Sequence, residues 1–390
     1  MSQPADFANF QNEIYLGGLM GQTPPFPVSW AALERAAEEA MTPEAWGYVG
    51  GSAGTEDTAR ANLEAFRRWR IVPRHLRDVS VRDLSTELFG AQLRAPVLLA
   101  PVGVQGIVHP DRELAVARAA ASMNVPMVLS TAATASMEEV AEANGDGLRW
   151  YQLYWPRDPE LTKSFLKRAE ANGYSAVVIT LDTFILAWRP RDLQSAYLPF
   201  LKGEGIQQYL ADPVFREGLP EPLENHLQDA ALKWVQVFSD PSTTWDRLAF
   251  VRENTSLPIL LKGILHPDDA RKAIDHGMDG VIVSNHGGRQ VDGSIGALDA
   301  LPGVVEAVAG KIPVLFDSGI RSGADAVKAI ALGAKAVLLG RPYIWGLAIG
   351  GEEGVRHVLR CFLAEMELTM ALSGTPTLAD LTPDTLTRIE

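Results

Sequence analysis

The 390-residue sequence contains a single cysteine, Cys361, which lies in an apolar run near the C-terminus. One thiol cannot form an internal disulfide or a thiolate metal cluster, so we interpret Cys361 as a packing residue and expect no metal site. No apolar run approaches the length of a membrane span. The first residues also lack the basic and apolar segments of a secretory signal, which makes the cytoplasm the expected location.

Positive charge is in short supply. The chain has 35 Lys and Arg residues against 48 Asp and Glu, for a formal net charge of −13. Such a surface repels the phosphates of nucleic acids and anionic membranes, so we expect neither as a partner. A local basic pocket can still bind a small anion. Hydrophobic residues make up 47% of the chain, which is enough to bury the core of a large globular domain.

Eight short apolar segments alternate with helical patterns from about residue 95 onward. They cover residues 96–101, 126–130, 149–154, 176–182, 258–263, 280–286, 313–319 and 336–340. Each is rich in Val, Ile and Leu without polar alternation, as in strands buried on both faces. Helical patterns follow most of them, for example at residues 111–123, 159–171, 268–276 and 324–332. Eight such units predict a (β/α)8 TIM barrel, with an open sheet as the alternative.

We expect one domain over residues 1–390, with the barrel in residues 95–350. Residues 1–94 form an N-terminal extension with helical patterns at 29–40 and 58–68, expected to cover the barrel bottom and reach toward its top. Residues 351–390 are expected to form a C-terminal helical segment. Residues 190–243 form a long insertion after the fourth strand. Loops of this length are often lids, and an inert surface insertion with short helices is the alternative.

Polar side chains follow nearly every predicted strand at the same end. In chain order they are Pro101-Val102-Gly103, Ser130, Gln152 with Tyr154, Thr180 with Asp182, Lys262, Ser284-Asn285-His286-Gly287-Gly288-Arg289, Asp317-Ser318-Gly319-Ile320-Arg321 and Gly340-Arg341. A TIM barrel carries its chemistry at the C-terminal ends of its strands, and side chains two apart on a strand share a face. This convergence favours a barrel with a site over an open sheet.

The last two strand ends combine glycine with arginine. Gly319 and Gly340 allow a close backbone approach, and Arg321 and Arg341 add positive charge. The loops after strands seven and eight are the usual phosphate site of this fold. We therefore predict phosphate binding here, with turn glycines and surface arginines as the alternative.

His286 is the candidate catalytic base. Its ordinary pKa suits proton transfer at neutral pH, and Asp182 from the fourth strand can orient the imidazole. Arg289 and Arg189 can hold a carboxylate by paired hydrogen bonds, although Arg189 can instead form salt bridges within its charged patch. Lys262 emerges from an apolar strand, so its ammonium group needs an anionic partner.

These motifs together resemble the FMN-dependent 2-hydroxy acid oxidases. The resemblance runs from about Tyr48 to the C-terminus, and the segments 284–289 and 317–321 carry it most specifically. The stretches Asn12-Glu13-Ile14-Tyr15 and Trp188-Arg189-Pro190-Arg191-Asp192, with the long insertion, are most similar to lactate 2-monooxygenase within this family.

The resemblance implies that FMN is the cofactor. The backbone of residues 101–103 and the side chains of Ser130, Gln152, Thr180 and Ser284 would hold it. Lys262 would lie beside the flavin N1–C2 edge, and residues 317–321 with Gly340-Arg341 would bind the phosphate. Gly103 stands where many members carry alanine, and its missing methyl group would leave space near the reactive flavin N5.

The resemblance also implies the substrate contacts. Tyr48, Arg189 and Arg289 would bind the substrate carboxylate, Tyr154 would contact its hydroxyl, and His286 would take the hydroxyl proton with Asp182 in support. The segment around Tyr48 departs from the pattern of the family, which makes Tyr48 the weakest of these assignments.

The implied activity is oxidation of a small L-2-hydroxy acid, most simply L-lactate, with O2 as electron acceptor. Release of the 2-oxo acid and peroxide makes the enzyme a simple oxidase, whereas decarboxylation within the site makes it a monooxygenase. A dehydrogenase with another acceptor and a non-catalytic phosphate-binding barrel are the alternatives. The resemblance further implies a homo-oligomer, either a tetramer or an octamer.

Overall fold

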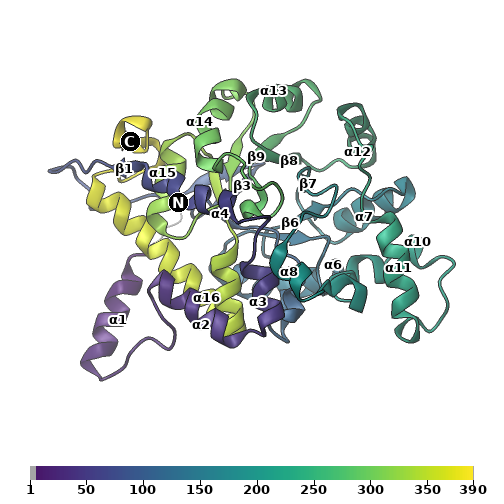
Figure 1. The fold of residues 1–390 in the computed structure, drawn as a ribbon. Helices are drawn as coiled ribbons and strands as arrows, with labels where there is room; N and C mark the ends of the chain where they lie inside the picture. Colours follow the sequence, from purple (N-terminus) through teal and green to yellow (C-terminus); the bar gives the residue numbers. More distant parts are fainter. Residues whose placement is uncertain (1–5, 390) are drawn as a thin grey trace.

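The computed structural model describes residues 6–389, which form a closed barrel of eight parallel strands surrounded by helices (Figure 1). The strands are β4 (Val97–Leu99), β5 (Met127–Ser130), β6 (Arg149–Leu153), β7 (Val177–Thr180), β8 (Ile259–Ile264), β9 (Gly280–Val283), β10 (Val314–Phe316) and β11 (Ala336–Leu339). They follow one another in chain order, and β11 pairs with β4 to close the circle. The predicted (β/α)8 TIM barrel is thus confirmed, and the open sheet is excluded.

Every barrel strand places at least one apolar side chain in a common inner cluster. Its members include Leu98, Val128, Trp150, Val178, Leu260, Ile282, Leu315 and Leu338, one from each strand. The neighbours of these residues along each strand, such as Leu99 and Leu129, belong instead to the larger cluster that packs against the surrounding helices. Both faces of each strand are buried, which explains why the sequence segments show no polar alternation.

Six of the eight strands end earlier than predicted, whereas β5 ends at Ser130 as predicted and β8 continues one residue further, to Ile264. The predicted sixth strand, 280–286, ends at Val283, and a 3-10 turn, η5 (His286–Gly288), follows it. The backbone of His286 lies in the left-handed region, with φ of 58°, and Ser318 has φ of 82°. Extended pairing cannot continue through such residues, so the polar segments form loops above the barrel.

The barrel helices are placed close to the predicted ranges. They are α5 (Arg112–Met123), α6 (Met137–Asn144), α7 (Pro159–Ala171), α12 (Leu248–Asn254), α13 (Pro267–Asp275), α14 (Ala297–Val308), α15 (Gly323–Ala331) and α16 (Arg341–Ser373). Several begin where the sequence offers an N-cap. The Asp158 side chain accepts from the N–H groups of Glu160 and Leu161, and Ser322 forms a capping box with Asp325.

The N-terminal extension reaches both ends of the barrel. Its helices are α1 (Asn9–Leu19), α2 (Trp30–Ala40), α3 (Pro43–Gly50) and α4 (Asp57–Arg67). A hairpin of β2 (Thr86–Leu88) and β3 (Ala91–Leu93) adds Leu88 and Leu93 to the inner cluster. At the opposite end, α4 packs against η5, which contains His286. The extension therefore closes the bottom of the barrel and contributes to the top, as the sequence predicted.

The C-terminal segment is only partly helical. The helix α16 already begins at Arg341, is interrupted at Gly350 and Gly351, and ends at Ser373. Two 3-10 turns follow, and then β12 (Leu386–Arg388), which pairs antiparallel with β1 (Trp69–Ile71). The prediction of a helical segment over 351–390 missed this strand, because three residues are too few to show a periodicity.

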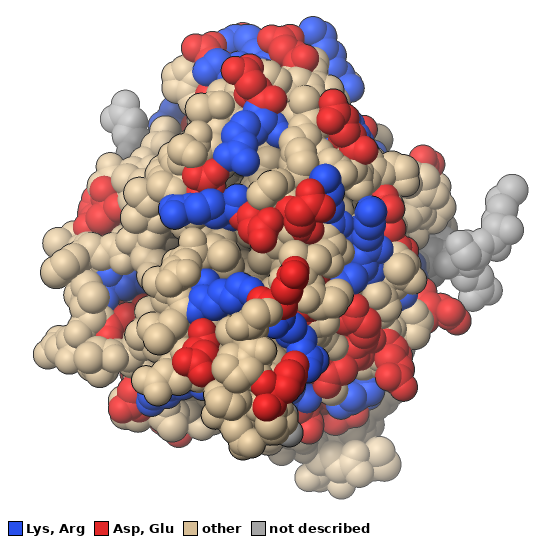
Figure 2. All heavy atoms as spheres, turned by 90° about the vertical axis from the view of Figure 1, so that its right-hand side faces the viewer, with Lys and Arg blue, Asp and Glu red and all other residues tan. Residues whose placement is uncertain are grey.

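The insertion after β7 folds into short helices. They are α8 (Pro190–Gln194), η2 (Pro199–Lys202), α9 (Gln207–Leu210), α10 (Pro213–Arg216), η3 (Leu223–Asn225), α11 (Leu227–Val237) and η4 (Trp245–Arg247). Of these, α10 and α11 lie with α12 on the right-hand side of Figure 1, and α8 lies near its centre beside α3. Acidic and basic side chains are interspersed on that face, as Figure 2 shows. No helix within residues 6–389 is long and apolar enough to cross a membrane.

Candidate active site

The base of the site is a set of side chains two residues beyond the inner apolar cluster. Continuing the alternation along each strand gives Ala100, Ser130, Gln152, Thr180, Lys262, Ser284, Asp317 and Gly340. Because alternate residues share a face, these residues follow the apolar ones at the mouth of the barrel. Six of the eight are polar, and all six are buried. A polar surface therefore lies directly on an apolar core, at the C-terminal ends of the strands.

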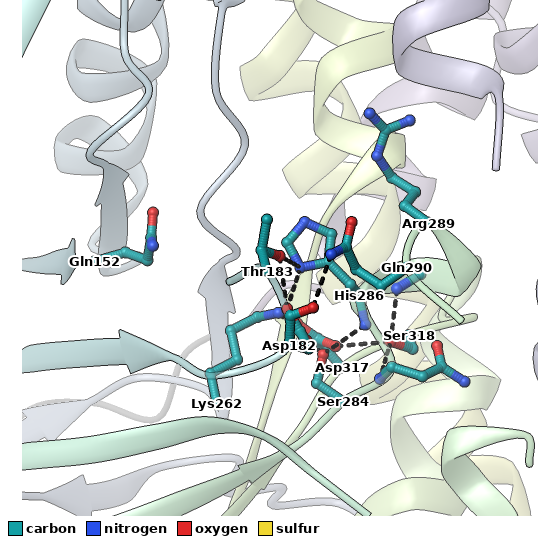
Figure 3. Close-up of polar contacts among 12 residues, drawn as sticks. Gln152, Asp182, Thr183, Lys262, Ser284, His286, Arg289, Gln290, Asp317 and Ser318 are labelled. Carbon is teal, nitrogen blue, oxygen red and sulfur yellow. Dashed lines mark hydrogen bonds and ion pairs between the residues drawn. The ribbon is translucent and has the colours of Figure 1, made fainter. Parts of the chain in front are cut away.

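Lys262 is the charged centre of this surface. Its Nζ donates to Ser284 Oγ at 2.9 Å and lies 3.2 Å from Asp317 Oδ2 (Figure 3). Burial alone would lower the pKa of Lys262, but the charges of Asp317 and Asp182 outweigh it and raise the pKa above the ordinary value. The ammonium group is therefore positively charged at neutral pH.

Two buried atoms of the same surface have no partner. Gln152 accepts from Ser130 Oγ at 3.0 Å through Oε1, but its Nε2 makes no hydrogen bond to any described residue, and neither does Thr180 Oγ1. Buried polar groups are nearly always hydrogen-bonded in native proteins, so such atoms indicate a missing ligand. An amide donor and a hydroxyl beside an ammonium group suit a planar ring that carries both donors and acceptors.

His286 and Asp182 meet above this surface. The distance from His286 Nδ1 to Asp182 Oδ1 is 2.7 Å, and Thr183 Oγ1 lies 2.9 Å from the same carboxylate oxygen and 3.2 Å from Nδ1 (Figure 3). Burial lowers the pKa of His286, and this effect outweighs the attraction of Asp182. The imidazole is therefore neutral at pH 7, with its Nδ1 proton directed at Asp182 and Nε2 free to accept another proton.

The Asp182 carboxylate is ionised. Burial alone would raise its pKa, but the charges of His286 and Lys262, with hydrogen bonds from His286 and Thr183, lower it below the ordinary value. A buried carboxylate behind a histidine stabilises the imidazolium that forms when the histidine takes a proton. The pairing predicted from the two strand ends is therefore present in the geometry.

The N-terminal extension fixes the loop that carries His286. The side-chain amides of Asn62, on α4, and Asn285 donate to each other at 2.8 and 2.7 Å. A Cβ atom on Gly288 would lie only 2.6 Å from the backbone nitrogen of Ala59, so this loop needs glycine to pack against α4. Asp292 accepts from the N–H groups of Thr55 and Asp57 at 2.6 and 2.7 Å, which caps α4 from a distant part of the chain.

Two arginines lie together without a carboxylate partner. Arg289 donates to the backbone carbonyls of Tyr48 and Gly51 and lies over the Tyr48 ring at 5.0 Å from its centre. Arg189 Nε donates to the Arg289 carbonyl at 3.0 Å. Burial and the nearby charge of Arg189 together lower the pKa of Arg289 to about 10. Within residues 6–389, neither guanidinium forms a salt bridge, whereas the neighbouring Arg191 pairs with Glu56 at 2.8 Å. The unbalanced charge is suited to a ligand carboxylate.

A second pair of arginines lies after β10 and β11. Arg341 donates to the carbonyls of Val49 and Gly51, both at 3.0 Å, and Arg321 lies over the Trp345 ring. Burial lowers the pKa of both guanidiniums, and each is bonded only to neutral groups in the described part of the chain. The alternative of exposed arginines beside turn glycines is excluded, and the pair is suited to a phosphate.

One cavity joins these groups. Of the residues predicted from the sequence, its lining includes Tyr48, Pro101, Val102, Gly103, Tyr154, Arg189, Lys262, His286, Arg289, Asp317, Ser318, Gly319, Ile320, Arg321, Gly340 and Arg341. Ser130, Gln152, Thr180, Asp182 and Ser284 do not line it. Asp182 and Ser284 instead bond to His286 and Lys262, and Thr180 lines a neighbouring cavity that also reaches Tyr154.

The insertion supplies an aromatic wall that the sequence did not predict. Phe200 and Phe238 line the cavity, and the ring of Trp234 packs 4.6 Å from each of them, measured between ring centres. Phe200 also contacts Tyr48, and Phe238 contacts Tyr154. Part of this segment therefore forms the cavity wall, whereas its role as a lid stays a prediction. Tyr48, the weakest sequence assignment, is buried at the edge of the same cavity.

The expectation of open space at Gly103 needs correction. A Cβ atom built on Gly103 would lie 2.8 Å from both the Cβ atom and the carbonyl oxygen of Ala132. The volume of the missing methyl group is thus taken by the loop after β5. Sequence alone could not show this, because the neighbour lies 29 positions away.

Other contributing residues were missed. Thr183 and Gln290 directly follow Asp182 and Arg289, and their position beside these residues was the only signal available. Asn62 and Asp292 gave no signal, because an isolated Asn or Asp is typical of any helix end or turn.

The donors in and beside the cavity fit FMN. The unpartnered Gln152 and Thr180 atoms with Lys262 suit the polar edge of a flavin ring, and Arg321 with Arg341 suits its phosphate. This arrangement leaves His286, Arg189 and Arg289 for a substrate carboxylate and hydroxyl.

Comparisons with known proteins agree with this geometry. Residues 37–388 match the family model described as FMN-dependent dehydrogenase. The chain is 46% identical to the FMN-dependent alpha-hydroxy acid dehydrogenase qulF of Penicillium citrinum, over 99% of this chain and 97% of that protein. It is 45% identical to an L-lactate oxidase of Lysinibacillus sphaericus, with coverage of 93% and 94%. It is also 43% identical to human 2-hydroxyacid oxidase 1, with coverage of 87% and 91%.

A solved structure of mandelate oxidase superimposes with a TM-score of 0.80 at 37% identity, covering 93% of this chain and 98% of that one. Fold, site and relatives lead to one assignment. The chain belongs to the FMN-dependent dehydrogenase family and is an FMN-dependent alpha-hydroxy acid oxidoreductase.

Proposed function

We propose that this enzyme oxidises L-lactate, or a similarly small L-2-hydroxy acid, to the 2-oxo acid with O2 as electron acceptor. The observation that supports this most directly is the position of Arg189 and Arg289. Two guanidiniums that form no salt bridge within residues 6–389 face the same cavity as His286, whose Nε2 has no hydrogen-bond partner in that part of the chain. A 2-hydroxy acid has a carboxylate that the arginines can bind. On the adjacent carbon it has a hydroxyl that the histidine can reach. Two of the relatives are named L-lactate oxidase.

Each side chain has a defined task in this proposal. Arg289 and Arg189 hold the carboxylate, and Tyr154 donates a hydrogen bond to the substrate hydroxyl. Burial raises the pKa of Tyr154 far above neutral pH, so it remains a donor throughout. His286 Nε2 takes the hydroxyl proton, and Asp182 stabilises the resulting imidazolium. When bound, FMN would supply the acceptor for the hydrogen and two electrons lost from the substrate carbon and would pass the electrons on to oxygen.

Lys262 is proposed to stabilise negative charge at the cofactor. Its ammonium group is buried and positively charged, and Ser284 and Asp317 fix its direction. Such a fixed charge in a water-poor site stabilises developing negative charge without having to reorganise. The same Ser284 hydroxyl accepts from the His286 N–H at 3.1 Å, which links the positions of ammonium group and base.

The fate of the first product depends on how long the site stays closed. If the 2-oxo acid remains under the aromatic wall, peroxide decarboxylates it there, and lactate plus O2 yields acetate, CO2 and water. If it leaves first, pyruvate and peroxide are released. The packed rings of Phe200, Trp234 and Phe238 favour retention, so we propose the monooxygenase outcome, with plain oxidation as the alternative.

Product analysis in air tests the proposal. The purified holoenzyme is mixed with L-lactate, and pyruvate, peroxide, acetate and CO2 are measured over time. Acetate and CO2 without free peroxide support the monooxygenase, whereas pyruvate with equimolar peroxide supports the oxidase. Fast anaerobic bleaching of the flavin followed by slow recovery in oxygen would exclude both and favour another acceptor. (S)-Mandelate is the comparison substrate, because the solved structural relative is a mandelate oxidase.

We also propose a cytoplasmic homo-oligomer, a tetramer or an octamer, on the strength of the family resemblance. Light scattering after size exclusion measures the assembly, and fractionation of the source cells measures the location. A monomer, or recovery in an organelle, would contradict this part.

A further inference from the structure

Gln290 links two loops of the site through one side-chain amide. Its Oε1 accepts from Arg189 Nη2 at 2.5 Å. Its Nε2 donates to the backbone carbonyl of Asp182 at 2.7 Å and to that of Ile185 at 3.2 Å. Figure 3 shows the amide beside the His286 ring, with the bond to Asp182 drawn. The amide therefore contacts one arginine of the carboxylate pair and the residue that orients the base.

An amide is the side-chain group best suited to these contacts. The two carbonyl oxygens can only accept, so they need a donor, and the guanidinium can only donate, so it needs an acceptor. A carboxylate at this position would repel the two carbonyls. It would also neutralise the charge of Arg189, whereas the neutral amide fixes the guanidinium and leaves its charge free for a ligand.

The remaining contacts of Arg189 show why it needs this partner. Apart from Gln290, its bond within residues 6–389 is from Nε to the Arg289 carbonyl. The like charge of Arg289 lies close by, because the charge of Arg189 contributes to lowering the pKa of Arg289. A long, partly exposed side chain beside a like charge would otherwise turn toward solvent.

We propose that Gln290 is a positioning residue that aligns Arg189 for the substrate carboxylate and holds the backbone of Asp182 behind His286. Gln290 therefore affects both the binding of the substrate carboxylate and the orientation of the base, His286. The inference rests on the proposed function, in which Arg189 binds substrate and Asp182 supports the base.

Two variants separate this role from simple packing. Gln290→Leu keeps the approximate volume and removes all three hydrogen bonds. Loss of a hydrogen bond to a charged group predicts roughly a tenfold or greater weakening of carboxylate binding. We expect a similar slowing of flavin reduction, because Asp182 is no longer anchored. Gln290→Glu keeps the acceptor for Arg189 but adds a charge. Its carboxylate affinity should be low from pH 5 to 8, because a carboxyl group paired with the Arg189 guanidinium stays ionised over that range.

The test uses the FMN-loaded enzyme. Binding of pyruvate, which has the carboxylate but no hydrogen to transfer, is followed by calorimetry and by the flavin spectrum from pH 5 to 8. Reduction by L-lactate is followed anaerobically in a stopped-flow instrument. Gln92→Leu is the control, because Gln92 is exposed on β3, in the hairpin at the other end of the barrel.

The expected result is weaker pyruvate binding and slower reduction in Gln290→Leu, with Gln92→Leu unchanged. A Gln290→Leu enzyme with full FMN that matches the wild type within twofold in both measurements would overturn the proposal. If that variant fails to fold or to hold FMN, Gln290→Glu decides, because wild-type affinity at every pH would overturn the proposal equally. Wild-type enzyme that binds pyruvate but is not reduced by L-lactate would refute the proposed function and leave the affinity test of Gln290 intact.

Discussion

Replacing Asp182 with asparagine isolates the contribution of one charge to catalysis. The carboxylate lies 2.7 Å from His286 Nδ1, and the positive charge of an imidazolium is spread over the ring, roughly 4 Å away on average. Two unit charges at about 4 Å attract each other by about 4 kcal/mol at an effective dielectric constant of about 20. If the proton is between half and fully transferred in the transition state, Asp182→Asn raises the barrier by about 2–4 kcal/mol. That corresponds to roughly 30- to 1000-fold slower flavin reduction.

The new amide can also select the wrong tautomer. Its NH2 group can donate to Nδ1 of His286, which moves the ring proton to Nε2 and removes the base. Both effects lower the rate and leave the carboxylate contacts of Arg189 and Arg289 in place. We therefore expect the rate of reduction at saturating L-lactate to fall far more than the affinity for pyruvate.

The pH profile gives an independent check. The pKa of His286 lies below its ordinary value of 6.5. The rate of flavin reduction by the wild type should therefore rise with pH as His286 loses its proton, below pH 6.5, and then level off. Asp182 raises the pKa of His286, so its removal should move the rise to still lower pH and lower the plateau. Stopped-flow reduction under anaerobic conditions measures both. Asp146→Asn, at an exposed position before β6, is the matched control. An Asp182→Asn enzyme with full FMN and a plateau within threefold of the wild type would refute the reasoning.

Three further variants test other parts of the site. Arg289→Lys loses the planar fork that reaches two carbonyls, and pyruvate binding measured by calorimetry should weaken by about 1.5–3 kcal/mol; unchanged affinity would remove Arg289 from the carboxylate site. Asp292→Asn should lower the melting temperature at pH 7. Hydrogen bonds from the start of α4 lower the pKa of Asp292 to about 2, so its contribution is complete above 3.8 and is lost as the pH falls toward 2, where wild type and variant should converge. Gly103→Ala should destabilise the protein by about 1–3 kcal/mol through its contact with Ala132, and Gly103→Ala with Ala132→Gly should recover only part of that loss in a thermal melt, because the contact with the carbonyl oxygen of residue 132 remains.

The barrel could be predicted from the sequence because its strands are buried on both faces. Runs such as Ile259-Leu260-Leu261 give an unbroken apolar signal, and the polar residues that follow them mark one end of the barrel. His286, Asp182 and Lys262 were found because each lies at a strand end, where the fold itself determines the meeting point.

The parts that were missed depend on contacts between distant segments. Asn62 bonds to Asn285, and Asp292 caps α4, across more than 220 positions of sequence. Phe200 and Phe238 belong to an insertion without a regular period, so nothing in their spacing predicted that they would reach the cavity. The strand β12 exists because β1 offers it a pairing edge, and three residues have no period of their own.

The closure of the barrel between β11 and β4 has a consequence for biosynthesis. The two strands that pair lie at opposite ends of the barrel sequence, and Arg341 and Ile344, which line the cavity, follow β11 directly. During translation, the other segments that line the cavity, from α3 to β10, emerge before β11. They cannot enclose a cofactor until about residue 344 has left the ribosome. A nascent chain therefore exposes the unpaired edge of β4 through most of its synthesis. Flavin capture is expected to be a late event that follows chain completion.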